Sequence, residues 1–324
     1  MPLPRSFLAI GLILSVSPVA LAEKPTIGLL PKLIGIDFFN AAEKGAEEAA
    51  AELGVELVYD GPDTNDVSRQ AQMVETWTAR RFDAIAVAPN DPVAIAPSLT
   101  KARRRNVKTL TWDADALVES RDYFINQADP ADIAMELMDG MAEGIGPEGK
   151  YIVLTGSLTA NNQNIWMKEM ERIRSAKYPR MKNLTETPLA TQEDQALATQ
   201  VTIDALKSYP DVQGIFAITS VALPGAAEAL RKTGAAGKIF LTGLSTPNSM
   251  RPYFKDGTVK RMVLWSPVDL GYLTVHAAKS LLDGKIGEES MEAGRLGTVQ
   301  VRGDEILLGK PTVFTPENID DYDF

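Results

Sequence analysis

The sequence predicts an α/β protein of two similar lobes, in which helices cover both faces of parallel sheets. Short apolar runs alternate with longer amphipathic stretches, which is the pattern of βαβ units. The alternation runs through the first half of the chain and begins again near residue 151. About 300 residues follow a predicted export segment, and a chain of this length suggests two domains.

In the first half, the apolar runs have the length of buried strands and the stretches between them have the length of helices. The predicted strands cover residues 26–30, 55–59, 84–88 and 107–112. The predicted helices, in which apolar residues recur at helical spacing, cover residues 39–53, 67–80 and 95–105. A strand-like segment at 123–129 then leads into a helix at 130–143.

The second half repeats this order. Its predicted strands cover residues 151–154, 214–218, 239–242 and 262–264, and its predicted helices cover 166–176, 192–208 and 225–232. No low-complexity linker separates the halves, so we expect short crossing strands to join two lobes with a cleft between them. Ligands of open α/β sheets bind beyond the carboxyl ends of the strands, so the residues that follow each strand are the candidates for a site.

The first residues predict export through a cleavable signal peptide. Arg5 precedes an apolar run over residues 7–13, and the segment ends with Ala20-Leu21-Ala22. A basic start, a short apolar stretch and an A-x-A ending are typical of secretory signals. The alternative, an uncleaved anchor helix, requires a longer apolar stretch. We therefore expect residues 1–22 to be removed, a mature chain that begins at Glu23, and a periplasmic location.

Composition restricts the chemistry. The formal charge is −10, and −11 without the single Arg of the signal segment, which argues against binding to nucleic acid. The absence of cysteine excludes disulfides, thiolate metal sites and cysteine nucleophiles, and His276 is the only histidine. No G-x-G-x-x-G motif follows a predicted strand and no G-x-x-x-x-G-K-[ST] motif occurs, so the usual cradles for dinucleotides and nucleotide phosphates are missing. We expect no cofactor, no metal and no catalysis.

The strand ends of the first half carry side chains suited to a polyol. Lys32 follows the first strand and lies near Phe38 and Phe39, so an amine can donate to hydroxyls while a ring stacks on hydrocarbon. Either phenylalanine could instead pack into the core. Asp91 follows the third strand and Asp113 the fourth, and each could bind hydroxyls or cap a helix. We expect Asp91 to be a cap and Asp113 to bind ligand.

In the second half, the first strand is followed by the polar segment Asn161-Asn162-Gln163-Asn164. Side-chain amides offer both donors and acceptors, which is the mixture a polyol needs. A simple polar turn is the alternative interpretation.

These segments resemble the periplasmic binding proteins of ribose-type sugar importers, and the resemblance extends over the whole mature chain. Similarity to the autoinducer-2 receptor branch is carried by Pro31-Lys32-Leu33-Ile34-Gly35, Leu110-Thr111-Trp112-Asp113-Ala114-Asp115, Ile125-Asn126-Gln127, Ser245-Thr246-Pro247-Asn248, Asn318-Ile319 and Tyr322-Asp323-Phe324. Similarity to the rhamnose-binding branch is carried by Asn162-Gln163-Asn164-Ile165-Trp166, Thr219-Ser220-Val221, the segment from Trp265 to Tyr272 and Gly294-Arg295-Leu296-Gly297.

The resemblance implies two Rossmann-like lobes in the arrangement of type I periplasmic binding proteins, joined by three hinge crossings. The crossings are expected near residues 125–126, 264–266 and 291–298. The amino-terminal lobe is expected to comprise residues 23–125 and 266–292, and the carboxy-terminal lobe residues 126–265 and 293–324. The resemblance also implies a monomer that closes around one ligand and delivers it to an ABC permease in the inner membrane.

Individual positions bear on the ligand. Lys32, Asp113 and Gln163 match ligand-contacting residues of the autoinducer-2 receptors, but Asn162 replaces an aspartate there, and 218–220 replaces Pro-Asp-Ala. Against the ribose-binding proteins, less polar side chains stand at four positions, namely Ile36, Asn162, Ser245 and Trp265. The expected ligand-binding residues are Lys32, Phe38, Phe39, Asn90, Asp113, Asn162, Gln163, Thr219, Ser220, Ser245 and Trp265.

The resemblance therefore implies the solute-binding component of a sugar importer, with a deoxysugar such as rhamnose as the favoured ligand. An autoinducer-2 or related furanose or polyol receptor is the alternative within the family. A sugar-modifying enzyme is a remote alternative, and an additional role with a chemoreceptor is compatible with the same features. A sugar-responsive repressor shares the fold but begins with a DNA-reading helix-turn-helix, whereas this chain begins with an export signal.

Overall fold

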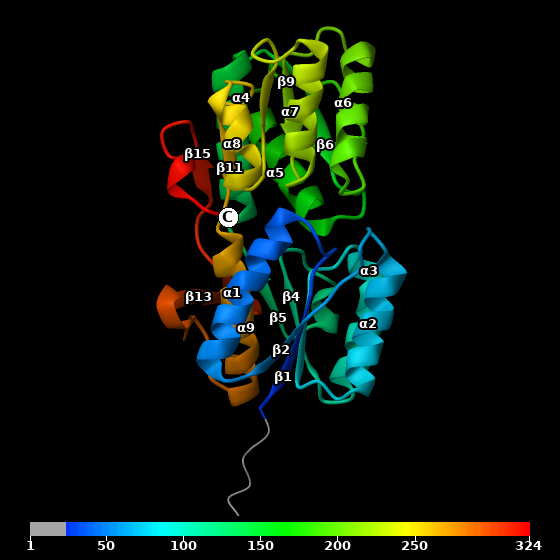
Figure 1. Cartoon of the computed structure of the whole chain (residues 1–324), viewed down its shortest axis with the longest axis vertical. Coiled ribbons are helices and arrows are strands. Elements are labelled where there is room, and N and C mark those ends of the chain that lie inside the picture. Colours follow the sequence, from blue (N-terminus) through cyan, green and yellow to red (C-terminus); the bar gives the residue numbers. More distant parts are fainter. Residues whose placement is uncertain (1–23) are drawn as a thin grey trace, which may run out of the picture.

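The structure, a computed structural model, describes residues 24–324 and consists of two α/β lobes that follow one another along the long axis (Figure 1). Both main sheets consist mostly of parallel strands with helices on both faces, so the predicted fold class is confirmed. The predicted signal peptide, residues 1–22, lies outside the described residues. Between residues 24 and 324, no helix combines the length and the apolar character needed to cross a bilayer.

The first lobe contains an eight-stranded sheet with the order β12-β13-β14-β5-β4-β3-β1-β2. Its strands are β1 (Thr26–Leu30), β2 (Glu56–Tyr59), β3 (Ala84–Val87), β4 (Lys108–Trp112), β5 (Tyr123–Asn126), β12 (Ser290–Glu292), β13 (Thr298–Arg302) and β14 (Glu305–Leu307). Helices α1 (Asp37–Leu53) and α9 (Pro267–Asp283) pack together on one face, and α2 (Val67–Ala79) and α3 (Pro92–Arg103) on the other (Figure 1). The short helices η1 (Val118–Ser120) and η2 (Gly294–Leu296) also belong to this lobe.

The close packing of α1 against α9 depends on glycine. A Cβ atom on Gly45 of α1 would lie 1.8 Å from the carbonyl oxygen of Val268, and one on Gly271 of α9 would lie 1.9 Å from that of Ala42. Real side chains do not approach a backbone this closely, so only glycine allows the two helices to meet at this distance. This contact attaches α9, which comes late in the sequence, to the lobe that the chain builds first.

The second lobe contains a five-stranded sheet with the order β10-β9-β6-β7, in which β8 also pairs with β6. Its strands are β6 (Lys150–Thr155), β7 (Lys182–Asn183), β8 (Leu189–Ala190), β9 (Gly214–Ala217) and β10 (Phe240–Gly243), and β11 (Met262–Leu264) forms an antiparallel pair with β15 (Thr312–Phe314) beside it. Its helices are α4 (Pro130–Ile145), α5 (Asn161–Lys177), α6 (Gln195–Ser208), α7 (Ala222–Thr233), α8 (Pro247–Lys255) and η3 (Ile319–Asp321).

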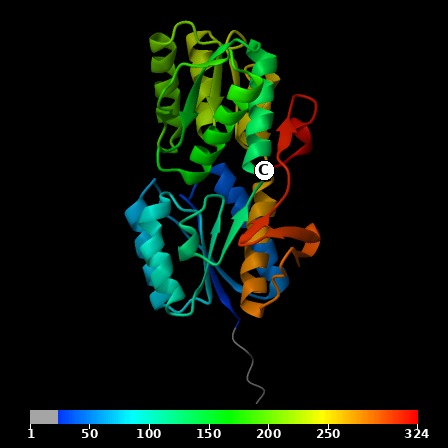
Figure 2. The same ribbon diagram turned by 180° about the vertical axis from the view of Figure 1, so that it is seen from behind.

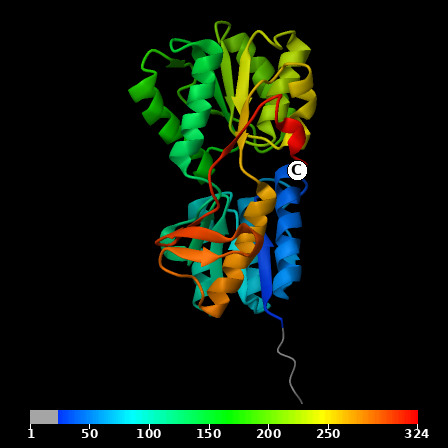
Figure 3. The ribbon, with the colours of Figure 1, turned by 90° about the vertical axis from the view of Figure 1, so that its left-hand side faces the viewer.

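Three segments cross between the lobes, and all run through the waist of the molecule (Figures 2 and 3). Residues 127–129 join β5 to α4, residues 265–266 join β11 to α9, and residues 308–311 join β14 to β15. The carboxyl ends of both parallel sheets face the waist, so the candidate site lies beside these crossings.

The expected position of the third crossing, 291–298, is wrong, and residues 293–307 belong to the first lobe rather than the second. β14 pairs in parallel with β5, and β13 pairs with β14 and β12, so all three strands extend the first sheet. The physical reason is the alternation in β13, where Val299 and Val301 are buried between exposed neighbours. A half-buried strand of this kind extends the edge of a sheet and does not cross to another lobe.

Candidate ligand-binding site between the lobes

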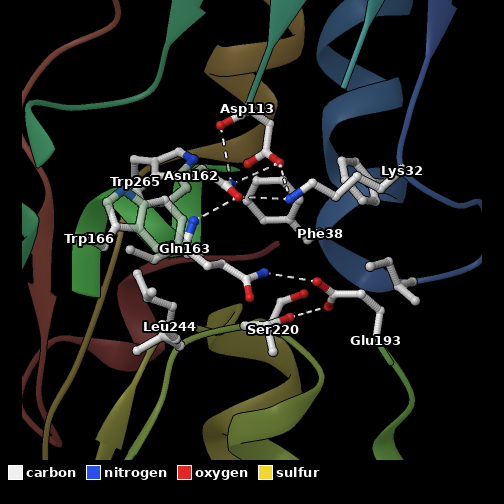
Figure 4. A pocket seen from close by; sticks show the side chains of 15 residues that line it. Lys32, Phe38, Asp113, Asn162, Gln163, Trp166, Glu193, Ser220, Leu244 and Trp265 are labelled. Carbon is white, nitrogen blue, oxygen red and sulfur yellow. Dashed lines mark hydrogen bonds and ion pairs between the residues drawn. The ribbon is translucent and has the colours of Figure 1, made fainter. Parts of the chain in front are cut away.

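A cavity lies between the lobes at the carboxyl ends of the strands (Figure 4). Nine of the eleven expected residues line it, namely Lys32, Phe38, Phe39, Asp113, Asn162, Gln163, Thr219, Ser220 and Trp265. The other lining residues are Ile36, Trp166, Glu193, Ile218, Leu244 and Leu264. The sequence pattern thus identified most of the cavity wall.

The first lobe contributes a buried ion pair. Lys32 follows β1 and Asp113 follows β4, and the Lys32 Nζ lies 3.2 Å from the Asp113 Oδ2 with both side chains almost inaccessible. Hydrogen bonds to its backbone fix the loop that carries Lys32. The Asn90 Nδ2 donates to the carbonyl oxygen of Lys32 at 2.8 Å. The Gln70 side chain donates to the carbonyl oxygen of Pro31 at 2.9 Å. Both charged groups therefore point into the cavity from a fixed backbone.

Burial dominates the electrostatics of Asp113. Loss of hydration raises the pKa of this carboxyl, and the Lys32 ammonium and the Asn162 amide oppose that rise because they stabilise the charged form. An ion pair so far from water depends on both partners, since removal of one leaves the other buried and uncompensated. Asp113 caps no helix in this structure: the next element, η1, begins only at Val118. Asp91, in contrast, caps a helix as predicted, because its Oδ1 accepts from the amides of Val93 and Ala94 at 2.9 Å each.

The second lobe contributes two amide side chains from the first turn of α5. The Asn162 Oδ1 accepts from the Lys32 Nζ at 3.0 Å, and the Asn162 Nδ2 donates to the Asp113 carbonyl oxygen at 3.2 Å. These bonds connect the lobes directly, so the structure represents a closed cleft. The Gln163 Oε1 accepts from the Thr155 hydroxyl at 2.5 Å and from the Gly156 amide at 2.7 Å. Its carbonyl is thus satisfied within the protein, and its Nε2 donates to the Glu193 Oε1 at 2.9 Å, which leaves one N–H of the amide for a ligand.

The opposite side of the cavity is apolar and aromatic. Phe38 and Trp265 meet edge to face with ring centroids 6.1 Å apart, and Trp166 lies 5.7 Å from Trp265. Figure 4 shows Trp166, Trp265 and Leu244 on one side, with Lys32 and Glu193 on the other. Phe39 also borders the cavity, but its ring packs against Trp112 of β4 at 5.5 Å. The alternatives left open for the adjacent phenylalanines therefore differ in outcome, since Phe39 packs mainly into the first lobe.

Two expected residues, Asn90 and Ser245, do not line the cavity. The Asn90 Nδ2 donates to the carbonyl oxygen of Lys32, as described above. The Ser245 hydroxyl donates to the carbonyl oxygen of Ser220 at 2.6 Å and lies behind it. Both residues support neighbours that do border the cavity, so their polar atoms already have partners within the protein.

Glu193 is the main polar residue that the sequence did not indicate. It lies within the predicted helix 192–208, but α6 begins only at Gln195, with Asp194 as its cap. Gln192 and Glu193 both have left-handed backbone conformations, with φ of 54° and 55°. Charged residues at the start of a helical pattern are common, and nothing in the local sequence distinguishes a carboxylate that turns inward.

Metal and histidine chemistry have no counterpart at this site. In the described part of the chain, no three histidine, aspartate or glutamate side chains are grouped so that they could hold a metal ion. His276 lies on α9, away from the cavity, with its ring centroid 4.5 Å from that of Tyr272. It is packed within the first lobe beside Glu52.

His276 should nevertheless affect the pH dependence of stability. Burial lowers its pKa, with Arg295 acting in the same direction and Glu52 and Glu48 opposing. As the pH falls below about 6.5, the unfolded chain takes up a proton at this position that the folded chain resists, so stability falls. We expect His276→Gln to show a smaller loss of melting temperature between pH 7 and pH 5 than the parent. Identical pH profiles for the two proteins, measured by differential scanning calorimetry, would contradict this.

Two α/β lobes, three crossings and a half-polar, half-aromatic cavity between them define a two-lobe solute-binding protein. Residues 27–286 match the family described as periplasmic binding protein domain, and the chain belongs to this family. The resemblance inferred from the sequence motifs is thereby confirmed.

Individual relatives cover nearly the whole chain. The ribose import binding protein of Bacillus subtilis is 27% identical over 279 residues, which span 83% of this chain and 85% of that protein. LsrB from Clostridium saccharobutylicum, solved in complex with AI-2, is 28% identical with a TM-score of 0.88, covering 92% of this chain and 100% of that one. A solute-binding protein of an ABC transporter from Clostridium phytofermentas, solved with bound L-rhamnose, is 28% identical with a TM-score of 0.89, covering 93% and 98%.

Proposed function

We propose that this protein is the periplasmic solute-binding component of an ABC sugar importer and that it binds a small deoxysugar such as rhamnose between its lobes. The observation that carries the proposal is the division of the cavity into a hydrogen-bonding side and an apolar side. A deoxysugar has the same division, with hydroxyls around most of the ring and a methyl group at one edge. The relative from Clostridium phytofermentas, which has L-rhamnose bound, supports this choice.

The polar side matches sugar hydroxyls in number and kind. Lys32 and the second N–H of Gln163 can donate, the Asp113 carboxylate can accept, and the Ser220 hydroxyl can do both. The Thr219 hydroxyl donates to Glu193, so towards a ligand it can only accept. Hydrogen bonds to the charged groups are worth about 1.5–3 kcal/mol each in place of the water they displace. The sugar thus replaces part of the hydration that the charged pair loses when the cleft closes.

The apolar side argues against a ligand with hydroxyls all around its ring. Ile36, Leu244, Leu264 and the ring of Trp265 offer no partner apart from the indole N–H. A hydroxyl left unpaired against such a surface costs about 1–3 kcal/mol, whereas each buried methyl or methylene group contributes about 0.8 kcal/mol. These magnitudes favour a deoxysugar over ribose at the same position.

Autoinducer-2 is the second candidate, because the relative from Clostridium saccharobutylicum was solved with AI-2 and Lys32, Asp113 and Gln163 are retained. Against it stands Asn162, a neutral amide that accepts from Lys32 and donates to Asp113. An aspartate here would place a second acid beside Lys32. We expect the combined variant Asn162→Asp, Ile218→Pro, Ser220→Ala to bind autoinducer-2 more tightly than the parent does and a deoxysugar more weakly. Tight binding of autoinducer-2 by the parent, with no binding of a deoxysugar, reverses the ranking.

A thermal-shift panel tests the proposal. It contains L-rhamnose, D-fucose, D-ribose, D-allose, erythritol and autoinducer-2. A ligand at 100 times its Kd adds about 2.7 kcal/mol to stability, which raises the melting temperature by about 4 °C for a protein of this size. We expect the largest shift with a deoxysugar. No shift with any of the six compounds contradicts the proposed ligand class.

The remaining features of the proposal concern location and partners. We expect the signal peptide to be cleaved after Ala22 on export, so amino-terminal sequencing of protein from the periplasmic fraction should begin at Glu23. We infer a monomer that delivers its sugar to a permease in the inner membrane, as members of an ABC importer do. A second role with a chemoreceptor uses the same closed state and needs no further site.

A further inference from the structure

Glu193 has a left-handed backbone conformation that a glutamate disfavours and that contacts with the rest of the fold maintain. Two consecutive non-glycine residues, Gln192 and Glu193, adopt left-handed conformations that side chains disfavour. The turn is fixed to the end of β6, because the amide of Thr191 donates to the Thr155 carbonyl at 2.8 Å and that of Gln192 to the Gly156 carbonyl at 2.7 Å. Strained turns of this kind persist where the surroundings enforce them, and they are frequent at ligand sites.

The turn directs the carboxylate of Glu193 into the wall of the cavity, where the residue is 7% exposed. The Gln163 Nε2 donates to its Oε1 at 2.9 Å, and the Thr219 hydroxyl donates to its Oε2. Gly156 leaves room for it, since a Cβ atom there would lie 2.0 Å from the Glu193 Oε1. Each oxygen therefore has one neutral donor from the protein, and a carboxylate can accept about four hydrogen bonds.

No cation balances this carboxylate within the described residues. Lys32 forms its ion pair with Asp113, and no ion pair of residues 24–324 includes Glu193. Glu193 also borders a second, outer hollow, which Asp37, Asp63 and Asp194 line and to which no lysine or arginine contributes. Glu193 thus stands between the buried cavity and an acidic surface, with acceptor capacity that the protein does not use.

We propose that Glu193 is a ligand-binding residue that accepts hydrogen bonds from ligand hydroxyls, and that it makes the site one for uncharged polyhydroxylated ligands. The inference rests on the proposed function, since it concerns the same cavity. A buried carboxylate with two neutral partners is stabilised by every further donor it receives. A sugar hydroxyl supplies such a donor, whereas a carboxylate or phosphate on the ligand would repel it. The competing role is a brace that merely orients Gln163 and Thr219.

Calorimetric titration of Glu193→Gln and Glu193→Ala separates the two roles. Glutamine can still form hydrogen bonds with Gln163 and Thr219 but lacks the charged acceptor, so a brace predicts parent-like affinity for Glu193→Gln, whereas a ligand-binding carboxylate predicts a loss in both variants. The titrant is whichever of L-rhamnose, D-fucose, D-ribose and D-allose raises the melting temperature of the parent most. Asp194→Asn is the matched control, because it removes the adjacent exposed acid while an asparagine can still accept from the Leu197 amide and cap α6. We expect Glu193→Gln and Glu193→Ala to lose about tenfold or more in affinity, with Asp194→Asn unchanged and all ligand-free melting temperatures close to that of the parent.

The possible failures can be told apart. If the parent binds its sugar and Glu193→Gln binds it equally well, Glu193 is a brace or has no role in binding, and the inference is wrong while the proposed function stands, whatever the affinity of Glu193→Ala. If Asp194→Asn weakens binding as much as Glu193→Gln, the effect is one of general charge and the assigned hydrogen bond is wrong. If the parent binds none of the four sugars, the proposed function fails and the role of Glu193 fails with it.

Discussion

Asp113→Ala should weaken sugar binding by about tenfold to a hundredfold and leave the ligand-free protein as stable as the parent. The carboxylate lies 3.2 Å from Lys32 and is almost inaccessible in the closed cleft, and a hydrogen bond from a ligand hydroxyl to such a group is worth about 1.5–3 kcal/mol. In the open state, water reaches Lys32 and replaces the missing partner. The substitution is therefore expected to destabilise the closed, liganded state rather than the ligand-free protein.

Calorimetric titration and thermal unfolding of the same preparation separate these effects. Asp91→Asn is the control, because Asp91 follows the neighbouring strand but caps α3, and asparagine caps a helix about as well. The control should bind sugar like the parent. Parent-like affinity in Asp113→Ala would mean that the carboxylate serves Lys32 alone and does not contact the ligand.

Trp265→Ala should cost both affinity and stability, and its effect on stability should be the largest of any substitution considered for the site. The indole lies in the crossing between β11 and α9, between Phe38 of one lobe and Trp166 of the other, and is 3% exposed. Truncation of a buried tryptophan to alanine costs about 3–5 kcal/mol. The same change removes the ring that, in the proposed function, packs against the apolar edge of the sugar, and we expect it to loosen the crossing around which the lobes close.

Trp77→Ala provides the matched control for Trp265→Ala. Trp77 is equally buried and stacks on Phe82 at 5.3 Å, but it belongs to the core between α2, α3 and the sheet and does not border the cavity. Urea unfolding should show similar losses for the two variants, whereas only Trp265→Ala should lose affinity for sugar. Equal affinities for the two variants would show that Trp265 contributes to packing alone.

The regular part of the fold was predictable from the sequence because it depends on periodicity. The strands β1, β3, β4 and β9 are buried apolar runs, and each lies where its run of residues predicts. The cavity residues that follow these strands, such as Lys32 and Asp113, could be identified for the same reason, since the ends of parallel strands converge at one edge.

The remaining features depend on tertiary contacts that a local pattern does not encode. The strand β14 joins the first sheet beside β5, a strand some 180 positions earlier in the sequence. Three residues are too few to show a hydrophobic periodicity, so the sequence does not predict this pairing. Asn90 and Ser245 have the residue types of ligand contacts, and only the folded chain shows that their polar atoms serve the backbone of Lys32 and Ser220. Glu193 reaches the cavity through a left-handed turn that its sequence does not require.

We expect a bound sugar to draw the two lobes together around the cavity. Small-angle X-ray scattering of the parent, with and without the sugar that gives the largest thermal shift, tests it most directly. Closure about the three crossings predicts a smaller radius of gyration with that sugar, and no change with a sugar that gives no thermal shift. An unchanged radius at a sugar concentration where calorimetry shows saturation would contradict the account, because the polar groups of the two lobes would then not converge on the ligand.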